Sequence, residues 1–184
     1  MKLRPLFLSV TVLLFIQVIR AQTVASADEV MKAAYQKAAT ENKNVLLMFH
    51  ASWCVWCHRM DSSINDPSCR NFFDENFIVE HLTVDESKDK KNLENPGADE
   101  MRKKYGGDGL GIPYWLIFDK KGKLLADSRV REDANVKSKP GDNSGCPASE
   151  KEVAYFIKVL KKTSNMNAAQ EAAITKRFRE NEPR

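Results

Sequence analysis

Cys54, Cys57 and His58 lie in the segment SWCVWCHRMD, and their spacing fits two different kinds of chemistry. The three residues together form C-x-x-C-H, the pattern to which a c-type haem is covalently attached. The two cysteines alone form C-x-x-C, the pattern of a dithiol that cycles between oxidised and reduced states. The motif predicts either an electron carrier that holds iron or an enzyme that exchanges disulfides, so the surrounding elements must distinguish them.

The first part of the chain, residues 1–27, has the composition of a secretory signal peptide. Lys2 and Arg4 precede an apolar run over residues 6–19, which is shorter than the roughly 20 apolar residues that a bilayer span needs. Small residues follow, and we expect cleavage after Ala27 or after Ala21. The sequence therefore predicts an exported protein, periplasmic or secreted, in surroundings where disulfides persist.

The net charge does not indicate a nucleic-acid partner. The formal net charge is +4, but removing the signal peptide takes away three basic residues and no acidic ones, which leaves +1. A nucleic-acid-binding domain usually carries a concentrated basic surface. We expect one compact domain over residues 28–163, followed by a C-terminal helix or tail over residues 164–184.

The predicted elements alternate between helices and strands. A helix is expected to begin near Cys54, another short helix follows near Cys69, and a capping box at Ser149 begins a further helix. Helical spacing also predicts helices over 28–42 and 92–105, and runs of strand-forming residues predict strands over 44–49, 78–84, 114–118 and 124–126. A strand–helix–strand unit requires parallel pairing and the hairpin adds antiparallel strands, so the sequence predicts a mixed sheet with helices on both faces.

Four segments carry a family resemblance: VLLMFHASWCVWC, VEHLTVD, KYG and GIPYWLIFDKKGK. In this order, and followed by an amphipathic helix, they resemble the thioredoxin superfamily, in particular exported bacterial members with a W-C-x-W-C motif. The resemblance extends from about Asp28 to Lys162. It implies an α/β, thioredoxin-like three-layer fold in which helices flank a central mixed β-sheet. It also favours the dithiol over the haem, because c-type haem domains are usually sets of helices around the porphyrin.

The resemblance implies a thiol–disulfide oxidoreductase with Cys54 as the nucleophile and Cys57 as the resolving cysteine. Cys54 is expected where a strand turns into a helix, and there the backbone N–H groups and the helix dipole favour the thiolate. Cys57 would attack the mixed disulfide and release the substrate. We expect no cofactor and no metal, since Cys69 and Cys146 do not form a second close pair of zinc ligands.

Substrate binding is implied at Ile112 and Pro113, where Pro113 resembles the family's cis-proline. The backbone of Ile112 would pair with an extended peptide, whereas a trans proline would merely begin an edge strand. Trp53 and Trp56 would offer apolar surface to protein substrates that carry disulfides or thiols. A membrane electron donor is a further candidate partner, and we expect a monomer. The alternative is a peptide-binding or chaperone-like module in which the dithiol is not essential.

The buried acid–base pair of thioredoxins is absent from the matching positions, which hold Met48 and His81. His81 is therefore our candidate for the group that accepts the proton of Cys57, with His50 as the second choice. The alternative is that His81 is a strand residue half in solvent and that water takes the proton.

Two further questions stay open in the sequence. Cys69 and Cys146 could form a disulfide, but the resemblance places them toward opposite ends of the sheet, so we favour free thiols. Val55 and Trp56, between the active cysteines, match neither the Gly-Pro of thioredoxin nor the Pro-His of strong oxidants. We favour a reductase of the cell envelope.

Overall fold

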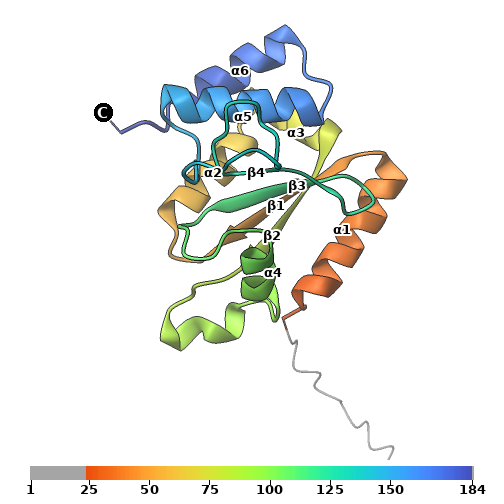
Figure 1. Ribbon diagram of the computed structural model, residues 1–184, viewed down its shortest axis with the longest axis vertical. Coiled ribbons are helices and arrows are strands. Elements are labelled where there is room, and N and C mark those ends of the chain that lie inside the picture. The colour runs from red at the N-terminus through yellow and green to blue at the C-terminus, as the bar shows by residue number, and fades with distance from the viewer. Residues whose placement is uncertain (1–23, 184) are drawn as a thin grey trace, which may run out of the picture.

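A four-stranded mixed sheet runs through the middle of the protein (Figure 1). The computed structural model describes residues 24–183. The strands are β1 (Asn44–His50), β2 (Phe77–Thr83), β3 (Tyr114–Phe118) and β4 (Leu124–Asp127), in the spatial order β2-β1-β3-β4. Strand β1 pairs in parallel with β2 and antiparallel with β3, and β3 pairs antiparallel with β4. The sheet has the mixed pairing that the element order predicts.

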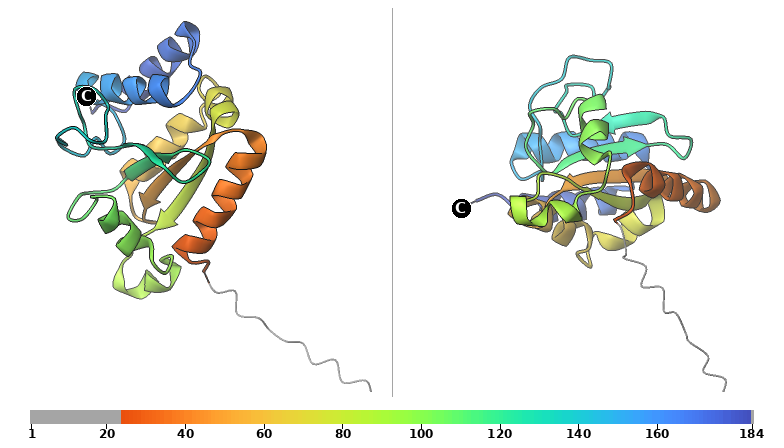
Figure 2. Two further views of the ribbon diagram at one scale, coloured as in Figure 1. Left: turned by 45° about the vertical axis from the view of Figure 1, so that its right-hand side comes forward. Right: turned by 90° about the horizontal axis from the view of Figure 1, so that it is seen from below.

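Helices cover both faces of the sheet (Figure 1; Figure 2). One face packs against α1 (Ala27–Glu41) and α4 (Ala98–Lys104). The other face packs against α2 (Val55–Ile64), α3 (Arg70–Asn76), α5 (Glu150–Thr163) and α6 (Ala168–Arg179). The three-layer architecture predicted from the sequence is therefore confirmed.

The central strand β1 supplies side chains to both cores. Leu46 and Met48 join the core beneath α2 and α5, whereas Val45, Leu47 and Phe49 join the core beneath α1. Successive side chains of a strand point to opposite faces, so a strand covered on both sides is apolar without interruption. This explains why the segment before the cysteine motif is a continuous apolar run.

The single helix predicted over residues 92–105 is wrong. A short 3-10 helix spans Lys88–Leu93, and α4 begins only at Ala98. Pro96 interrupts the helical path because it lacks an N–H group and disfavours the helical conformation in the residue before it. Gly97 then precedes α4 with φ +82, a left-handed conformation that glycine adopts at little cost.

Both ends of the described chain are tied into the fold. Ser26 caps α1 and forms a capping box with Glu29. At the other end, Ile174 and Phe178 of α6 are fully buried, so the C-terminal segment is a packed helix. The predicted signal peptide lies outside the described residues except for its last four positions. Within residues 24–183, no helix is both long and apolar enough to span a membrane.

Candidate active site

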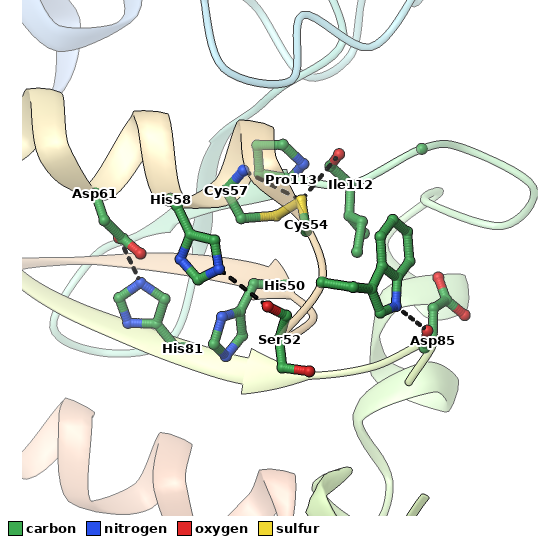
Figure 3. Close-up of a disulfide and its surroundings, with 12 residues drawn as sticks. His50, Ser52, Cys54, Cys57, His58, Asp61, His81, Asp85, Ile112 and Pro113 are labelled. Atoms are coloured by element: carbon green, nitrogen blue, oxygen red, sulfur yellow. Dashed lines mark hydrogen bonds and ion pairs between the residues drawn. A yellow bond between two sulfur atoms is a disulfide. The ribbon is translucent and has the colours of Figure 1, made fainter. Parts of the chain in front are cut away.

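Cys54 and Cys57 form a disulfide at the N-terminus of α2 (Figure 3). Strand β1 ends at His50, and the following turn brings Cys54 to the N-cap position of the helix. The Sγ atom of Cys54 accepts a hydrogen bond of 3.1 Å from the backbone N–H of Cys57. N–H groups in the first turn have no partner within the helix and favour negative charge. The geometry would thus stabilise a thiolate on Cys54 once the disulfide is reduced.

The disulfide is buried, but the residues next to it in the chain expose apolar side chains. Cys54 is 3% exposed and Cys57 is fully covered. In contrast, Trp53 is 56% exposed, Val55 62% and Trp56 37%, and we call these three residues the apolar rim. Most other large apolar side chains of the described chain are buried, so this rim is a place where apolar surface of another molecule could be covered.

Polar contacts fix the turn that carries the cysteines. The Glu86 carboxylate accepts hydrogen bonds from the Ser52 backbone N–H at 2.5 Å and from the Ser52 hydroxyl at 2.8 Å. Burial alone would raise the pKa of Glu86, but these hydrogen bonds outweigh it and lower the pKa below its usual value. The Trp53 indole N–H donates to the Asp85 carbonyl at 2.8 Å, and the His58 ring lies 3.0 Å from the Ser52 carbonyl.

The Ile112–Pro113 peptide bond is cis and lies against the disulfide (Figure 3). The carbonyl oxygen of Ile112 is 3.6 Å from the Sγ atom of Cys54. An open groove of about 290 Å³ begins here, and we call it the Pro113 groove. Its lining residues come from α2, the cis-proline segment, the loop before α5 and the first turn of α5: Trp56, Gly111, Ile112, Pro113, Asn143, Ser144, Gly145, Cys146, Ala148 and Glu152.

The other two cysteines are buried free thiols, and they are not bridged. Cys69 packs in the core beneath α3, and its burial raises the pKa of its thiol. Cys146 lines the Pro113 groove, and burial raises its pKa to about 12. A thiol with a raised pKa holds very little of the reactive thiolate at neutral pH. The structure therefore separates the Cys54–Cys57 disulfide from two thiols whose burial disfavours the thiolate.

The histidines gather on one side of the disulfide, away from Ile112 and Pro113 (Figure 3). His81 is the register partner of Met48, as the resemblance implies. Its Nε2 atom lies 2.8 Å from Oδ1 of Asp61 on α2, and its ring centroid is 5.0 Å from that of His50. Burial, followed by the nearby charge of His81, lowers the pKa of His50. The polar contact that the structure gives His81 is thus with Asp61 rather than with Cys57.

A family comparison decides between the two interpretations of the cysteine motif. Residues 27–120 match a family model described as thioredoxin-like. The chain belongs to the thioredoxin-like family. At the general level, membership of this family and the Cys54–Cys57 disulfide support thiol–disulfide exchange at this site.

Several solved structures resemble this thioredoxin-like chain. A disulphide isomerase from Xylella fastidiosa Temecula1 is 26% identical, with a TM-score of 0.45 over 56% of this chain and 73% of that one. A DsbH oxidoreductase is 21% identical, with a TM-score of 0.44 over 80% of this chain and 92% of that one. The oxidised C-terminal domain of DsbD from Neisseria meningitidis is 24% identical, with a TM-score of 0.39 over 55% and 81%. A search of curated proteins gave no match.

Three residues at the site of this thioredoxin-like protein were missed by the sequence analysis. Glu86 holds the turn before Cys54, and Asp61 contacts His81. Asn143 donates through its side chain to the carbonyls of Gly111 at 2.7 Å and Pro113 at 3.1 Å, on either side of the cis bond. Asp61 lies one turn after Cys57 on the helix, which was a usable signal, but the other two come from distant loops that no local pattern connects to the motif. Within residues 24–183, no group of three or more His, Cys, Asp or Glu side chains is arranged to hold a metal ion.

Proposed function

We propose that the protein is a protein thiol–disulfide oxidoreductase of the cell envelope, with Cys54 as the nucleophile and Cys57 as the resolving cysteine. The observation that carries the proposal is the Cys54–Cys57 disulfide at the N-terminus of α2, where the Cys57 N–H points at the Cys54 sulfur. The haem interpretation fits this geometry poorly, because both sulfurs are bonded to each other and the His58 ring contacts the Ser52 carbonyl.

The reaction in the reducing direction is a two-step exchange. The Cys54 thiolate attacks one sulfur of the substrate disulfide, so that a mixed disulfide forms and the other substrate sulfur leaves as a thiolate. Cys57 then loses its proton and attacks the Cys54 sulfur, which releases the second substrate thiolate and leaves the Cys54–Cys57 disulfide. Two electrons pass to the substrate, and a separate dithiol donor, which would be a membrane protein in an envelope, must restore the reduced pair.

The Pro113 groove is the proposed binding site for the substrate peptide. Ile112 presents its backbone beside the Cys54 sulfur, and an extended peptide could pair with it as an added strand. Trp53 and Trp56 of the apolar rim would cover apolar side chains on either side of the substrate cysteine. Main-chain pairing with an apolar rim suits many protein substrates, and the protein would act as a monomer.

His81 is the proposed proton acceptor during resolution, acting as a unit with Asp61 and His50. The Asp61 carboxylate, 2.8 Å from Nε2 of His81, would orient the imidazole ring. Because His81 has no direct contact with Cys57, we propose that a water molecule or His50 carries the proton between them. Burial of Cys57 disfavours its thiolate, so such a path would speed the release step.

The position of α1 favours signal cleavage after Ala21. Cleavage after Ala27 would remove the N-cap Ser26 and also the buried Ala27, whose N–H donates to the Pro96 carbonyl at 2.8 Å. Losing a capping serine destabilises a helix by about 1 kcal/mol. N-terminal sequencing of protein recovered after export would distinguish the sites: it should begin at Gln22, and a start at Asp28 would contradict this.

A second candidate function is peptide binding without redox turnover, favoured by the exposed apolar rim. Insulin reduction by dithiothreitol separates the two functions. The wild-type protein should accelerate reduction, and Cys57→Ala should trap a mixed disulfide with the substrate through Cys54. If neither occurs, while a Cys54→Ala, Cys57→Ala double variant suppresses aggregation as well as wild type, the protein is a binding module. The equilibrium constant with glutathione tests the direction, since a potential near about −120 mV would identify an oxidant.

A further inference from the structure

The two walls of the Pro113 groove come from segments that are far apart in the sequence. One wall is Trp56 on α2, and the other is the loop that carries Cys146 and Ala148 before α5. An extended peptide between these walls must fit their separation. The segment after α6 contacts the loop with Cys146 and also contacts α2, the helix that carries Trp56.

Asn181 lies at this contact and is only 7% exposed. Its side-chain Nδ2 donates to the Sγ atom of Cys146 at 3.5 Å on one wall. The same group donates at 3.0 Å to the hydroxyl of Ser63, which belongs to α2. A single amide group therefore connects the loop before α5 to the active-site helix. A buried amide group that lacks hydrogen-bond partners destabilises the fold, so these two hydrogen bonds fix the position of the Asn181 side chain.

The backbone of Asn181 continues the connection to the rim of the groove. Its carbonyl accepts a hydrogen bond of 3.4 Å from Arg59, and the Arg59 guanidinium lies 4.5 Å from the centroid of the Trp56 ring. A guanidinium over an indole is attractive and restricts the orientation of the ring. The guanidinium of Arg179 donates a hydrogen bond of 2.5 Å to the Ala148 carbonyl on the opposite wall.

Helix α6 gives these contacts a rigid base. Phe178 is fully buried and its ring centroid lies 5.0 Å from that of Phe156 on α5. Arg177 pairs with Asp66 at 3.0 Å, beyond the end of α2. The N–H of Asn181 donates to the Phe178 carbonyl at 3.1 Å, so the position of Asn181 follows directly from the packing of α6.

We propose that Asn181 is a positioning residue that sets the separation of the two walls of the Pro113 groove and thereby its affinity for an extended peptide. The proposal rests on the proposed function and deepens it, because it concerns how the same site selects its substrate. Asn181 touches neither active sulfur, so a small disulfide that does not span the groove should be insensitive to it. A change at Asn181 should therefore weaken peptide binding and leave the rate of disulfide exchange with a small disulfide unchanged.

Asn181→Leu tests this, because leucine has the same number of side-chain heavy atoms and the same branching at Cγ but cannot form the hydrogen bonds. Reduction kinetics are compared for a linear peptide of about ten residues with a central mixed disulfide, and for hydroxyethyl disulfide. The KM for the peptide should rise about threefold to tenfold, as expected when the hydrogen bonds of the Asn181 side chain are lost. The kcat for the peptide, the rate with hydroxyethyl disulfide and the reduction potential should stay within about twofold of wild type. Asn165→Leu is the matched control, since that side chain is exposed.

An unchanged KM for the peptide would overturn the proposal, and so would an equal loss on both substrates, which would show a general disturbance of the site. Arg59→Met removes both the hydrogen bond to the Asn181 carbonyl and the guanidinium over Trp56, and it serves if Asn181→Leu does not fold. It should raise the peptide KM in the same direction. If the wild-type protein reduces neither disulfide, the proposed function fails; if wild type is active and both variants match it, only this inference fails.

Discussion

The imidazole of His81 and the carboxylate of Asp61 are 2.8 Å apart, and this pair connects the edge strand β2 to the active-site helix α2. Both side chains are about one-third exposed, which leaves them open to water on one side. Thioredoxins typically carry a buried acid–base pair inside the sheet, where this chain has Met48. The proposed proton acceptor, His81, thus lies at the edge of the sheet and partly in solvent.

We predict that His81→Ala slows resolution of the mixed disulfide at pH 7 by at least about tenfold, because water must then accept the proton. Raising the pH should restore the rate, since hydroxide takes over the role. Single-turnover release from a mixed disulfide, followed from pH 6 to pH 9, measures this. His58→Ala is the control, because His58 lies in the same group but contacts only the Ser52 carbonyl. A rate that is the same in wild type and His81→Ala across this range would remove His81 from the mechanism.

His50 should make the protein less stable as the pH falls. Burial and the neighbouring His81 lower the pKa of His50 in the folded state, so the unfolded chain binds more protons below its own pKa of about 6.5. Above a pH of about 6.5, His50 is neutral in both states and does not reduce the free energy of unfolding. As the pH falls below this value toward the pKa of His50 in the folded state, the free energy of unfolding decreases. Urea unfolding at a series of pH values should show this decline in wild type and a shallower one in His50→Gln. Parallel curves would contradict it.

Cys69 and Cys146 should resist alkylation in the folded, oxidised protein. Their pKa values are raised by burial, that of Cys146 to about 12, so at pH 8 only about one Cys146 thiol in ten thousand is ionised. Iodoacetamide at pH 8 should modify neither residue in buffer and both in concentrated urea. Mass spectrometry of the labelled protein gives the number of alkylated cysteines, and the variants Cys69→Ser and Cys146→Ser assign the labelled sites. Rapid labelling of Cys146 in buffer would show that the groove opens further than the structure indicates.

Phe178→Ala should destabilise the whole domain by about 3–5 kcal/mol, because it leaves a cavity among Phe73, Phe156 and the sheet. Chemical unfolding followed by tryptophan fluorescence measures this, since Trp115 lies in the same core. Leu93→Ala is the control, because Leu93 is 42% exposed and its loss should change stability by no more than about 0.5 kcal/mol. A loss of helix without a loss of global stability would mean that α6 unfolds as a separate unit.

The sheet, its mixed pairing and the location of the dithiol could all be predicted from local patterns. The continuous apolar run before Cys54 identifies a strand buried on both faces, and the capping box at Ser149 identifies the start of α5. For α6 the sequence predicts either a helix or a tail, because only two of its residues, Ile174 and Phe178, reach the core and its apolar stripe is narrow. The roles of Glu86 and Asn181 could not be predicted, because each depends on a contact with a residue distant in the sequence.

The packing of β1 has a consequence for the order in which the chain can acquire its structure during synthesis. Leu46 and Met48 share a core with Phe156 and Phe178, which are made more than a hundred residues later. Until those aromatic residues emerge, only α2 and α3 can cover this face of the central strand, and contacts of such long sequence separation form late. A chain that emerges from its N-terminus would therefore complete this core only after α5 and α6 had been made. The packing around Cys54 and Cys57 would be complete only at that point.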